Sequence, residues 1–371
     1  GMHAVRIVLL VASAALVLAV PLQNKQLPSD YTFAQYIQEF GKTYSSEELL
    51  LRERVFEKNV EMIRQHNNAG RSWTLGVGPF TDLTSEEFRK QRLGRVGGPG
   101  PELSSIERLP SLQSFDATQL PASVDWREKG VITDVKDQGS CGSCYAHASV
   151  EQIESFVALN SSKLLTLSTQ QVVSCAPNPK HCGGTGGCKG NVPEIVFEYL
   201  INAHGITTEW MYPYTSWTGT ESACDFNSST TAKHPPVATI KGWVKLAVND
   251  QAAVMHALAT VGPLAINVQA NVWQHYSSGV FEGCDNMTDI DIDHVVQLVG
   301  YGTDPEHGDY YLVRNSWDTW WGENGYIRLR RQAKPQCGID PTPLDGTGCD
   351  GGPPTQTVCG QCGLLFDASY P

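Results

Sequence analysis

The chain has 371 residues, of which 41% are apolar, and this length is sufficient for one large domain or for two to three smaller ones. Its formal net charge of −12 argues against an electrostatic nucleic-acid interface. Acidic and basic side chains balance in residues 1–119, so the whole acidic excess lies in residues 120–371.

Residues 1–20 have the features of a secretory signal peptide. His3 and Arg6 form a polar start, and a short apolar run from Ile7 to Val20 ends in small residues. The alternatives are a buried helix or an anchor that stays attached, although the run is short for a transmembrane span. No other apolar run approaches about 18 residues, so we expect no membrane segment after signal removal.

The eleven cysteines, taken together with a signal peptide, predict an oxidising compartment and disulfide bonds. Because the count is odd, at least one thiol is free or is paired outside the chain. Three N-x-[ST] sequons, at Asn160, Asn227 and Asn286, agree with a secretory route and with glycosylation.

Residues 30–90 predict a small helical module. Residues 30–69 have helical periodicity and no proline, and a cap at Ser45–Glu48 separates two amphipathic helices. A strand-like step, TLGVGPFTD, then leads to a further capped helix at Thr84. The apolar positions of the first two helices are Phe33, Tyr36, Ile37, Phe40, Leu51, Val55, Phe56, Val60 and Ile63.

Residues 91–119 are rich in Gly, Pro and Ser, which predicts an exposed linker. A charge-balanced helical module, a linker and an acidic, cysteine-rich body (residues 120–371) together indicate a removable pro-segment. We expect cleavage within a few residues of Leu120.

The body divides into a helical part and a strand-rich part. Residues 144–159, 168–176 and 192–204 predict helices, whereas β-branched and aromatic runs punctuated by Gly dominate from about residue 236 onward. Helices followed by antiparallel strands predict an α+β fold with two lobes.

A nucleophile and its partners can be recognised in this body. Cys144 stands at the start of the predicted helix, where the positive end of the macrodipole favours a thiolate. A thiolate nucleophile also needs a base, a group that orients the base and donors for the oxyanion. His294 opens an apolar strand, Asn315 ends another, and Gln138 lies six residues before the cysteine.

These segments resemble those of the papain-like cysteine proteases, of the cathepsin L type. QGSCGSCYAHAS matches the family's segment around its nucleophile, DHVVQLVGYG that around its histidine, and NSWDTWWGENGYIRLRR that around its asparagine. The interval of 150 residues between Cys144 and His294 lies in the range typical of these enzymes. The helix of the family's inhibitory I29-type propeptide is matched by Glu48, Arg52, Phe56, Asn59, Ile63 and Asn67.

The resemblance implies a cysteine endopeptidase with a papain-like, two-lobed fold: a helical lobe and an antiparallel, barrel-like lobe. Cys144 would be the nucleophile, His294 its imidazolium partner and Asn315 the orienter. Gln138 and the backbone N–H of Cys144 would form the oxyanion hole. Trp317 would shield the His294–Asn315 hydrogen bond from water.

The resemblance also implies pairing of Cys141 with Cys188, of Cys175 with Cys224, and of Cys284 with a cysteine near the C-terminus. Cys144 would remain free. The connectivity of the remaining cysteines stays open, and these are Cys182, Cys349, Cys359 and one of Cys337 and Cys362.

Two other interpretations compete at the same residues. The first is a zinc site made by Cys141, Cys144, Cys359 and Cys362, since a doubled C-x-x-C is a common zinc pattern. The second takes His147 as the base, although a residue three positions after Cys144 on a helix is better explained as packing between the lobes.

Substrate specificity is predicted from the resemblance alone. The family binds the peptide backbone at a glycine step that corresponds to Gly190 and Asn191. Asp367 is expected either to accept Arg at P2, through a bidentate ion pair, or to be a surface turn acid. The residues expected to contact substrate are Gly190, Asn191, Val192, Pro193, Asn267, Asp293, Val295, Trp317 and Asp367.

Residues 339–361 are a Gly/Pro-rich insertion for which we expect a surface loop. No insertion is seen that would block either end of the cleft, which favours an endopeptidase over an exopeptidase of the same fold. A catalytically silent, secreted homologue is a further alternative.

The partners that follow are peptide or protein substrates, the chain's own propeptide as an intramolecular inhibitor, and cystatin-like inhibitors. We expect a monomer, no cofactor, no metal, no nucleic acid, and delivery to a lysosome, a vacuole or the extracellular space.

Overall fold

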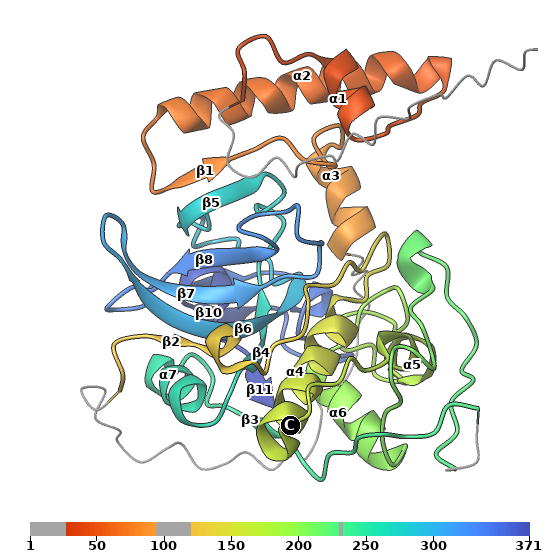
Figure 1. Cartoon of the computed structure of the whole chain (residues 1–371). Coiled ribbons are helices and arrows are strands. Elements are labelled where there is room, and N and C mark those ends of the chain that lie inside the picture. Colours follow the sequence, from red (N-terminus) through yellow and green to blue (C-terminus); the bar gives the residue numbers. More distant parts are fainter. Residues whose placement is uncertain (1–26, 94–119, 230–232) are drawn as a thin grey trace, which may run out of the picture.

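The computed structural model describes residues 27–93, 120–229 and 233–371 (Figure 1). The predicted signal peptide and most of the predicted linker therefore lie outside the described residues. The helices are α1 (Phe33–Glu39), α2 (Ser46–Asn68), α3 (Ser85–Phe88), α4 (Cys144–Ser161), α5 (Thr169–Cys175), α6 (Pro193–Asn202) and α7 (Gln251–Thr260). The strands are β1 (Trp73–Leu75), β2 (Val124–Asp125), β3 (Val244–Lys245), β4 (Leu264–Val268), β5 (Tyr276–Phe281), β6 (His294–Asp304), β7 (Gly308–Arg314), β8 (Tyr326–Arg330), β9 (Cys337–Asp340), β10 (Gln356–Cys359) and β11 (Ala368–Tyr370).

The propeptide module (residues 27–93) has the helices that its sequence predicts, but the exposed linker expected from residue 91 is wrong at its start, because Leu93 is buried in the hydrophobic core. Each of its three helices begins with a capping box, in which a Ser or Thr side chain and a Glu or Gln three residues later satisfy each other's backbone N–H groups. The aromatic faces of α1 and α2 meet around Phe33, Tyr36 and Phe56. Leu51, although in phase with this face, is 52% exposed.

The helical lobe is organised around α4, which is buried along most of its length between α5, α6 and the sheet (Figure 1). The buried surface of α4 is not only apolar: Glu154 and Glu151 lie in ion pairs with Lys136 and Arg314, which offset the cost of burying their charge. α4 packs against β6, and Cys144 of α4 and Val295 of β6 belong to one apolar cluster.

The sheet lobe is a mainly antiparallel sheet with the strand order β1-β5-β8-β7-β6-β4-β11-β3, and β2 pairs with β6 off this path. β5 and β8 are the parallel pair. The edge strand β1 comes from the propeptide module, and Trp73 lies opposite Gly279 of β5. The sheet therefore continues from the mature body into the propeptide.

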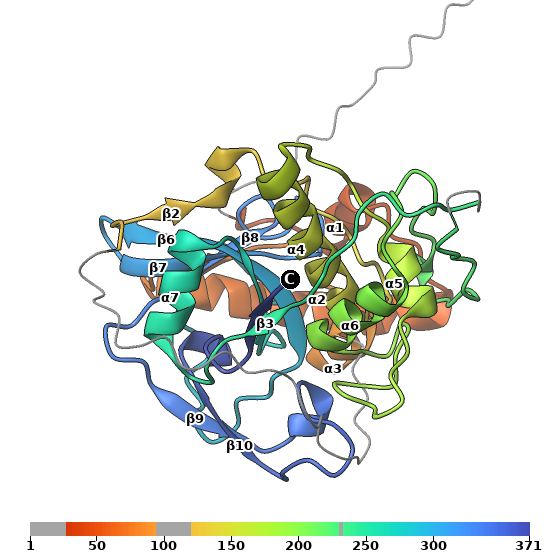
Figure 2. The same cartoon turned by 90° about the horizontal axis from the view of Figure 1, so that it is seen from below.

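The structure differs from the sequence prediction in two places. Helix α7 was not expected, because its sequence, QAAVMHALAT, is apolar on most sides and has no clear 3.6-residue period. The insertion was expected to be a surface loop, but β9 and β10 pair within it as a two-stranded ribbon (Figure 2).

Among the described residues, none of the helices combines the length and apolar character needed to cross a bilayer.

Five disulfides cross-link the body. Cys141–Cys188 and Cys175–Cys224 are present as expected, and Cys284 pairs with Cys362 near the C-terminus. The connectivity left open by the sequence is Cys182–Cys349 and Cys337–Cys359.

Candidate active site

Cys144 is the one cysteine that forms no disulfide, and its side chain is buried in the precursor. It is the first residue of α4, and the preceding Ser143 provides no side-chain cap for the first-turn N–H groups. These uncapped groups and the macrodipole of an 18-residue helix create a positive potential at the sulfur.

His294 is oriented by Asn315. The Nε2 atom of His294 lies 2.8 Å from Oδ1 of Asn315, and both residues are fully buried. The backbone N–H of Ser316 also donates to this Oδ1, at 2.8 Å, so the atom facing the imidazole is an acceptor. Nε2 consequently carries a proton, and Nδ1 is the nitrogen that can accept and return one.

Aromatic rings enclose this pair. The Trp317 ring lies 5.0 Å from the His294 ring at an interplanar angle of 32°, and Trp273 meets the imidazole edge-on at 6.3 Å. Both tryptophans are fully buried. The rings exclude water from the His294–Asn315 hydrogen bond, which is stronger in a low-dielectric setting.

Cys144 and His294 stand at the starts of two elements that pack against each other. α4 packs against β6, and Val295, the residue after His294, belongs to the same apolar cluster as Cys144. Cys144 and His294 are distant in sequence, and the packing of the lobes is what brings their two elements together.

Every polar atom of Gln138, in the backbone and in the side chain, has a hydrogen-bond partner. Its backbone N–H donates to the Ser316 carbonyl at 3.0 Å, and its side-chain Oε1 accepts from the Ser316 hydroxyl at 2.7 Å. The Tyr214 hydroxyl donates to its carbonyl at 2.8 Å. The amide Nε2 donates to the Cys141 carbonyl at 3.0 Å and to the Arg92 carbonyl at 2.7 Å.

The Arg92 contact places a propeptide carbonyl against the amide that we expect to stabilise an oxyanion. The Arg92 side chain adds two further bonds through Nη1, to Asp137 Oδ1 at 2.9 Å and to the Gly139 carbonyl at 2.8 Å. Its guanidinium also lies over the Phe80 ring, 4.2 Å from the ring centre. The end of the propeptide module is thus anchored beside Gln138.

The propeptide module reaches this position by docking on the aromatic edge of the sheet lobe. Phe88 meets Trp317 edge-on at 5.1 Å, and Phe80 meets Trp320 at 4.8 Å. Gln274 donates to the carbonyls of Phe80 and Leu83, at 2.9 and 3.1 Å. These contacts are non-covalent, so the docking is reversible.

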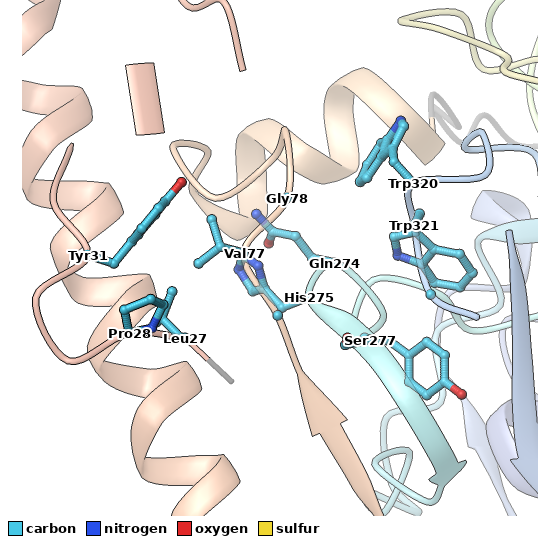
Figure 3. Close-up of a pocket in the computed structure, with 13 residues that line it drawn as sticks. Leu27, Pro28, Tyr31, Val77, Gly78, Gln274, His275, Ser277, Trp320 and Trp321 are labelled. Atoms are coloured by element: carbon cyan, nitrogen blue, oxygen red, sulfur yellow. The ribbon is translucent and has the colours of Figure 1, made fainter. Parts of the chain in front are cut away.

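A pocket lies between the propeptide module and the sheet lobe. Figure 3 shows Tyr31 and Val77 of the propeptide module facing Gln274 and His275 of the body. Burial at this junction lowers the pKa of His275 to about 4. The docked precursor therefore holds this imidazole neutral.

The residues expected to contact substrate are all buried in the precursor. The amide oxygen of Asn191 accepts from the Val192 backbone N–H at 2.9 Å, and Asp293 Oδ1 accepts from the Ala270 backbone N–H at 2.7 Å. Asn191 therefore bonds within its own loop, whereas Asp293 ties its segment to the residues that follow β4. Asn267, on β4, faces Val295 across the β4–β6 ladder.

Asp367 is only 2% exposed, so the interpretation as a surface turn acid is wrong. Lys245 Nζ lies 2.9 Å from Asp367 Oδ2 and 2.7 Å from Glu194 Oε1. Burial, together with the charge of Glu194, raises the pKa of Asp367 to about 7. One cation therefore serves two buried carboxylates.

His147 occupies a structural position. Its Nδ1 lies 3.0 Å from the Ser143 carbonyl, and its ring packs edge-on against Tyr214 at 4.9 Å. Burial lowers the pKa of His147 to about 3. These contacts favour the packing interpretation of this residue over that of a catalytic base.

The zinc interpretation is wrong. Of the four cysteines that it needs, Cys141, Cys359 and Cys362 are each in a disulfide with a cysteine outside the set. A disulfide sulfur cannot act as the thiolate ligand of such a site.

Four residues at the site were missed by sequence reasoning: Ser316, Tyr214, Lys245 and Arg92. Ser316 follows the recognised Asn315 directly, so its closeness to the site could have been inferred. The others carry no local signal, because their roles come from contacts with residues distant in the sequence.

Comparison with known proteins identifies two families along the chain. Residues 120–347 match the model of the papain family cysteine proteases, and residues 33–88 match that of the cathepsin propeptide inhibitor domain (I29). The senescence-specific cysteine protease SAG12 of Arabidopsis thaliana is 34% identical over 365 residues, covering 96% of this chain and 94% of that protein. A cathepsin L-like protein of Caenorhabditis elegans is 36% identical over 315 residues, covering 82% and 87% of the two chains.

Solved precursors have the same fold. A recombinant stem bromelain precursor superposes with a TM-score of 0.71 at 31% identity, covering 91% of this chain and 97% of that one. Digestive procathepsin L 3 from the larval midgut of Tenebrio molitor gives a TM-score of 0.71 at 30% identity, with the same coverage.

Proposed function

Because the chain belongs to the papain family of cysteine proteases, we propose that Cys144, His294 and Asn315 carry out its peptide-bond hydrolysis. The Cys144 thiolate attacks the carbonyl carbon of the scissile bond, and the imidazolium of His294 balances its charge. Asn315 keeps the proton on Nε2, so that Nδ1 is the nitrogen that exchanges a proton with the reacting groups.

Hydrolysis then follows in two steps. Attack forms a C–S bond and a tetrahedral oxyanion; collapse breaks the C–N bond, and His294 gives its proton to the leaving amine. The resulting thioester is attacked by water, which gives a proton to His294, and the second collapse releases the acid and regenerates the thiolate. The charge on the oxyanion is stabilised by Gln138 Nε2 and the backbone N–H of Cys144.

The observation that carries this proposal is the 2.7 Å hydrogen bond from Gln138 Nε2 to the Arg92 carbonyl. A peptide carbonyl already accepts from the amide to which we assign the oxyanion, and it belongs to the propeptide. Donors 2.7–3.1 Å from such an oxygen are what oxyanion stabilisation requires. The propeptide therefore blocks the site by filling the place of a substrate carbonyl.

The chain is a zymogen whose I29 domain is its intramolecular inhibitor. We expect activation by cleavage close to Leu120. Asp367 and Asn267, with Val192, Pro193 and Val295, would form the S2 pocket, and Gly190 and Asn191 would bind the substrate backbone. Asp367 shares the cation of Lys245 with Glu194, so an Arg at P2 competes with this lysine.

The five disulfides support passage through the secretory pathway. The three sequon asparagines are exposed and accessible to glycosylation. We expect the mature enzyme to be a monomer, to bind cystatin-like inhibitors, and to act in a lysosome, a vacuole or the extracellular space.

The direct test is acidification of the purified precursor with an epoxide thiol trap present. We expect one label, on Cys144, and, without the trap, self-cleavage near Leu120. The Cys144→Ser precursor is expected to remain intact under the same conditions. If this variant, free of other proteases, processed itself at the wild-type rate, the assignment of the nucleophile would be wrong.

An internally quenched peptide blocked at both termini tests the mode of cleavage. An endopeptidase cuts it, whereas an exopeptidase requires a free terminus and leaves it intact. We expect cleavage by the activated wild-type enzyme and none by the Cys144→Ser variant.

A further inference from the structure

The insertion joins the two lobes beside the active site. We call its residues 341–352 the strap. On the sheet-lobe side it emerges from β9, which is locked to β10 by Cys337–Cys359. Ile339 is bonded through its backbone to Ile290 at 2.9 Å and to Met287 at 2.8 Å. The start of the strap is thus fixed to the segment that leads into His294.

The far end of the strap is fixed to the helical lobe. Cys349 forms a disulfide with Cys182. The Gly183 N–H donates to the Gly348 carbonyl, and the Asp350 N–H donates to the Lys180 carbonyl, both at 2.9 Å. Figure 2 shows the blue chain after β9 reaching from the sheet lobe toward the lime-green loops beside α6.

Between its two anchors the strap touches both walls of the site. A methyl group added to Gly346 would lie 1.8 Å from the Ile292 carbonyl oxygen, two residues before His294. One added to Gly183 would lie 2.2 Å from the Gly346 carbonyl oxygen and 3.1 Å from Cγ1 of Val192. The backbone of the strap therefore fills the space between Ile292 and Val192, and Gly346 is buried.

We propose that the strap is a covalent wall at the acyl-side end of the substrate cleft, which replaces the expectation that no insertion obstructs either end. The inference rests on the proposed function, in which Val192 and Val295 hold the P2 residue. The cleft then takes P1 and P2, and the polypeptide N-terminal to P2 turns out of the cleft over the strap. The substrates are proteins whose recognition on the acyl side ends at P2.

Chain length on the acyl side tests this wall. The activated enzyme is assayed with N-terminally blocked fluorogenic peptides that present one, two, three or four residues before the same leaving group. A residue that finds a subsite raises kcat/KM by about tenfold or more. We expect such a gain from P1 to P2 and less than about threefold thereafter; a tenfold gain at P3 or P4 would overturn the proposal.

The Cys182→Ser/Cys349→Ser variant, made and activated as the full precursor, removes the covalent tie to the helical lobe. We expect its kcat/KM to rise about tenfold for the four-residue peptide and to change less than about threefold for the two-residue one. If kcat/KM of this variant depended on peptide length as it does in the wild type, the proposal that the strap closes the cleft would be contradicted. The wild-type series remains decisive if the variant does not fold.

Cys175→Ser/Cys224→Ser is the matched control, since it removes a disulfide of the helical lobe that does not include the strap. Its length profile should equal that of the wild type, and a change like that of the strap variant would contradict the proposal. Failure of the proposed function would look different: no peptide would be cut, and Cys144 would not be labelled.

Discussion

The propeptide module and the strap both cover the active site, and they are attached in different ways. The module docks through an added β-strand, aromatic contacts and hydrogen bonds such as that from Gln138 to Arg92. The strap is tied to the helical lobe by the Cys182–Cys349 disulfide and follows β9, which the Cys337–Cys359 disulfide joins to β10. The two covers meet at Asp291, which pairs with Arg89 of the module and accepts from the Thr342 hydroxyl of the strap at 3.3 Å.

Because of this difference, we assign inhibition to the propeptide module and substrate specificity to the strap. Non-covalent contacts depend on pH and on cutting the chain, so the module can leave. Disulfides in an oxidising compartment stay closed, so the strap remains in the mature enzyme. The propeptide module therefore controls when the active site becomes free, and the strap limits which substrates can bind.

Gln138→Ala has the largest expected effect, because this amide serves both catalysis and the removable cover. Loss of one oxyanion donor lowers kcat by about 10²- to 10³-fold. Steady-state kinetics of the activated enzyme measure this loss. Ser316→Ala is the matched variant: it removes the hydroxyl bond to Oε1 but keeps the backbone bond, so its loss should be clearly smaller. Equal losses would show that positioning, not the donor itself, matters at this residue.

Asp82→Ala should loosen the removable cover while leaving the strap intact. The buried Asp82 carboxylate accepts from Tyr36, Tyr44 and Lys42, at 2.6, 2.7 and 3.0 Å. Leaving these donors unpaired costs about 3 kcal/mol of module stability. Limited proteolysis in the Cys144→Ser background should show faster cleavage of the module at neutral pH.

The control for this variant is Glu57→Ala, at an exposed position of α2. It should leave the rate of proteolysis unchanged. Equal protection of the Asp82→Ala and wild-type modules would contradict the role given to the buried carboxylate.

His275→Gln tests the pH sensitivity of the removable cover. Burial in the docked precursor lowers the pKa of His275 to about 4, below its usual 6.5, so we expect the proton to bind better to a released form in which this histidine is exposed. Docking is therefore strongest above pH 6.5 and weakens as the pH falls toward 4, by on the order of 3 kcal/mol. Self-processing followed from pH 7 to pH 4 should accelerate less in the variant. An unchanged pH profile would exclude this histidine as a sensor.

Asp367→Asn has the smallest expected effect and concerns the pocket that the strap leaves open. The pKa of Asp367 is about 7, so its charge appears only as the pH rises through neutrality. At pH 5 Lys245 is balanced by Glu194 alone; at pH 8 the group carries one further negative charge. The ratio of kcat/KM for Arg over Leu at P2 should rise roughly three- to tenfold between these values, and the variant should abolish the rise. A rise that persists in Asp367→Asn would refute the placement of Asp367 at P2.

The sequence by itself determined the local structure and the residue types of the site. Capping boxes at Thr32, Ser45 and Thr84 and the 3.6-residue period fixed the helices of the module, because caps and amphipathic faces depend on neighbours in the chain. A cysteine at a helix start, with a His and an Asn at strand ends, was likewise recognisable from local patterns.

Only the tertiary structure decided which distant groups meet. The pairing of Cys182 with Cys349, the Lys245 bridge between Glu194 and Asp367, and the Arg92 carbonyl at Gln138 each join segments far apart in the chain. No local pattern specifies such contacts, since they depend on how the lobes pack and not on the residues beside them. The insertion that the sequence predicted as a surface loop became a wall of the active site for this reason.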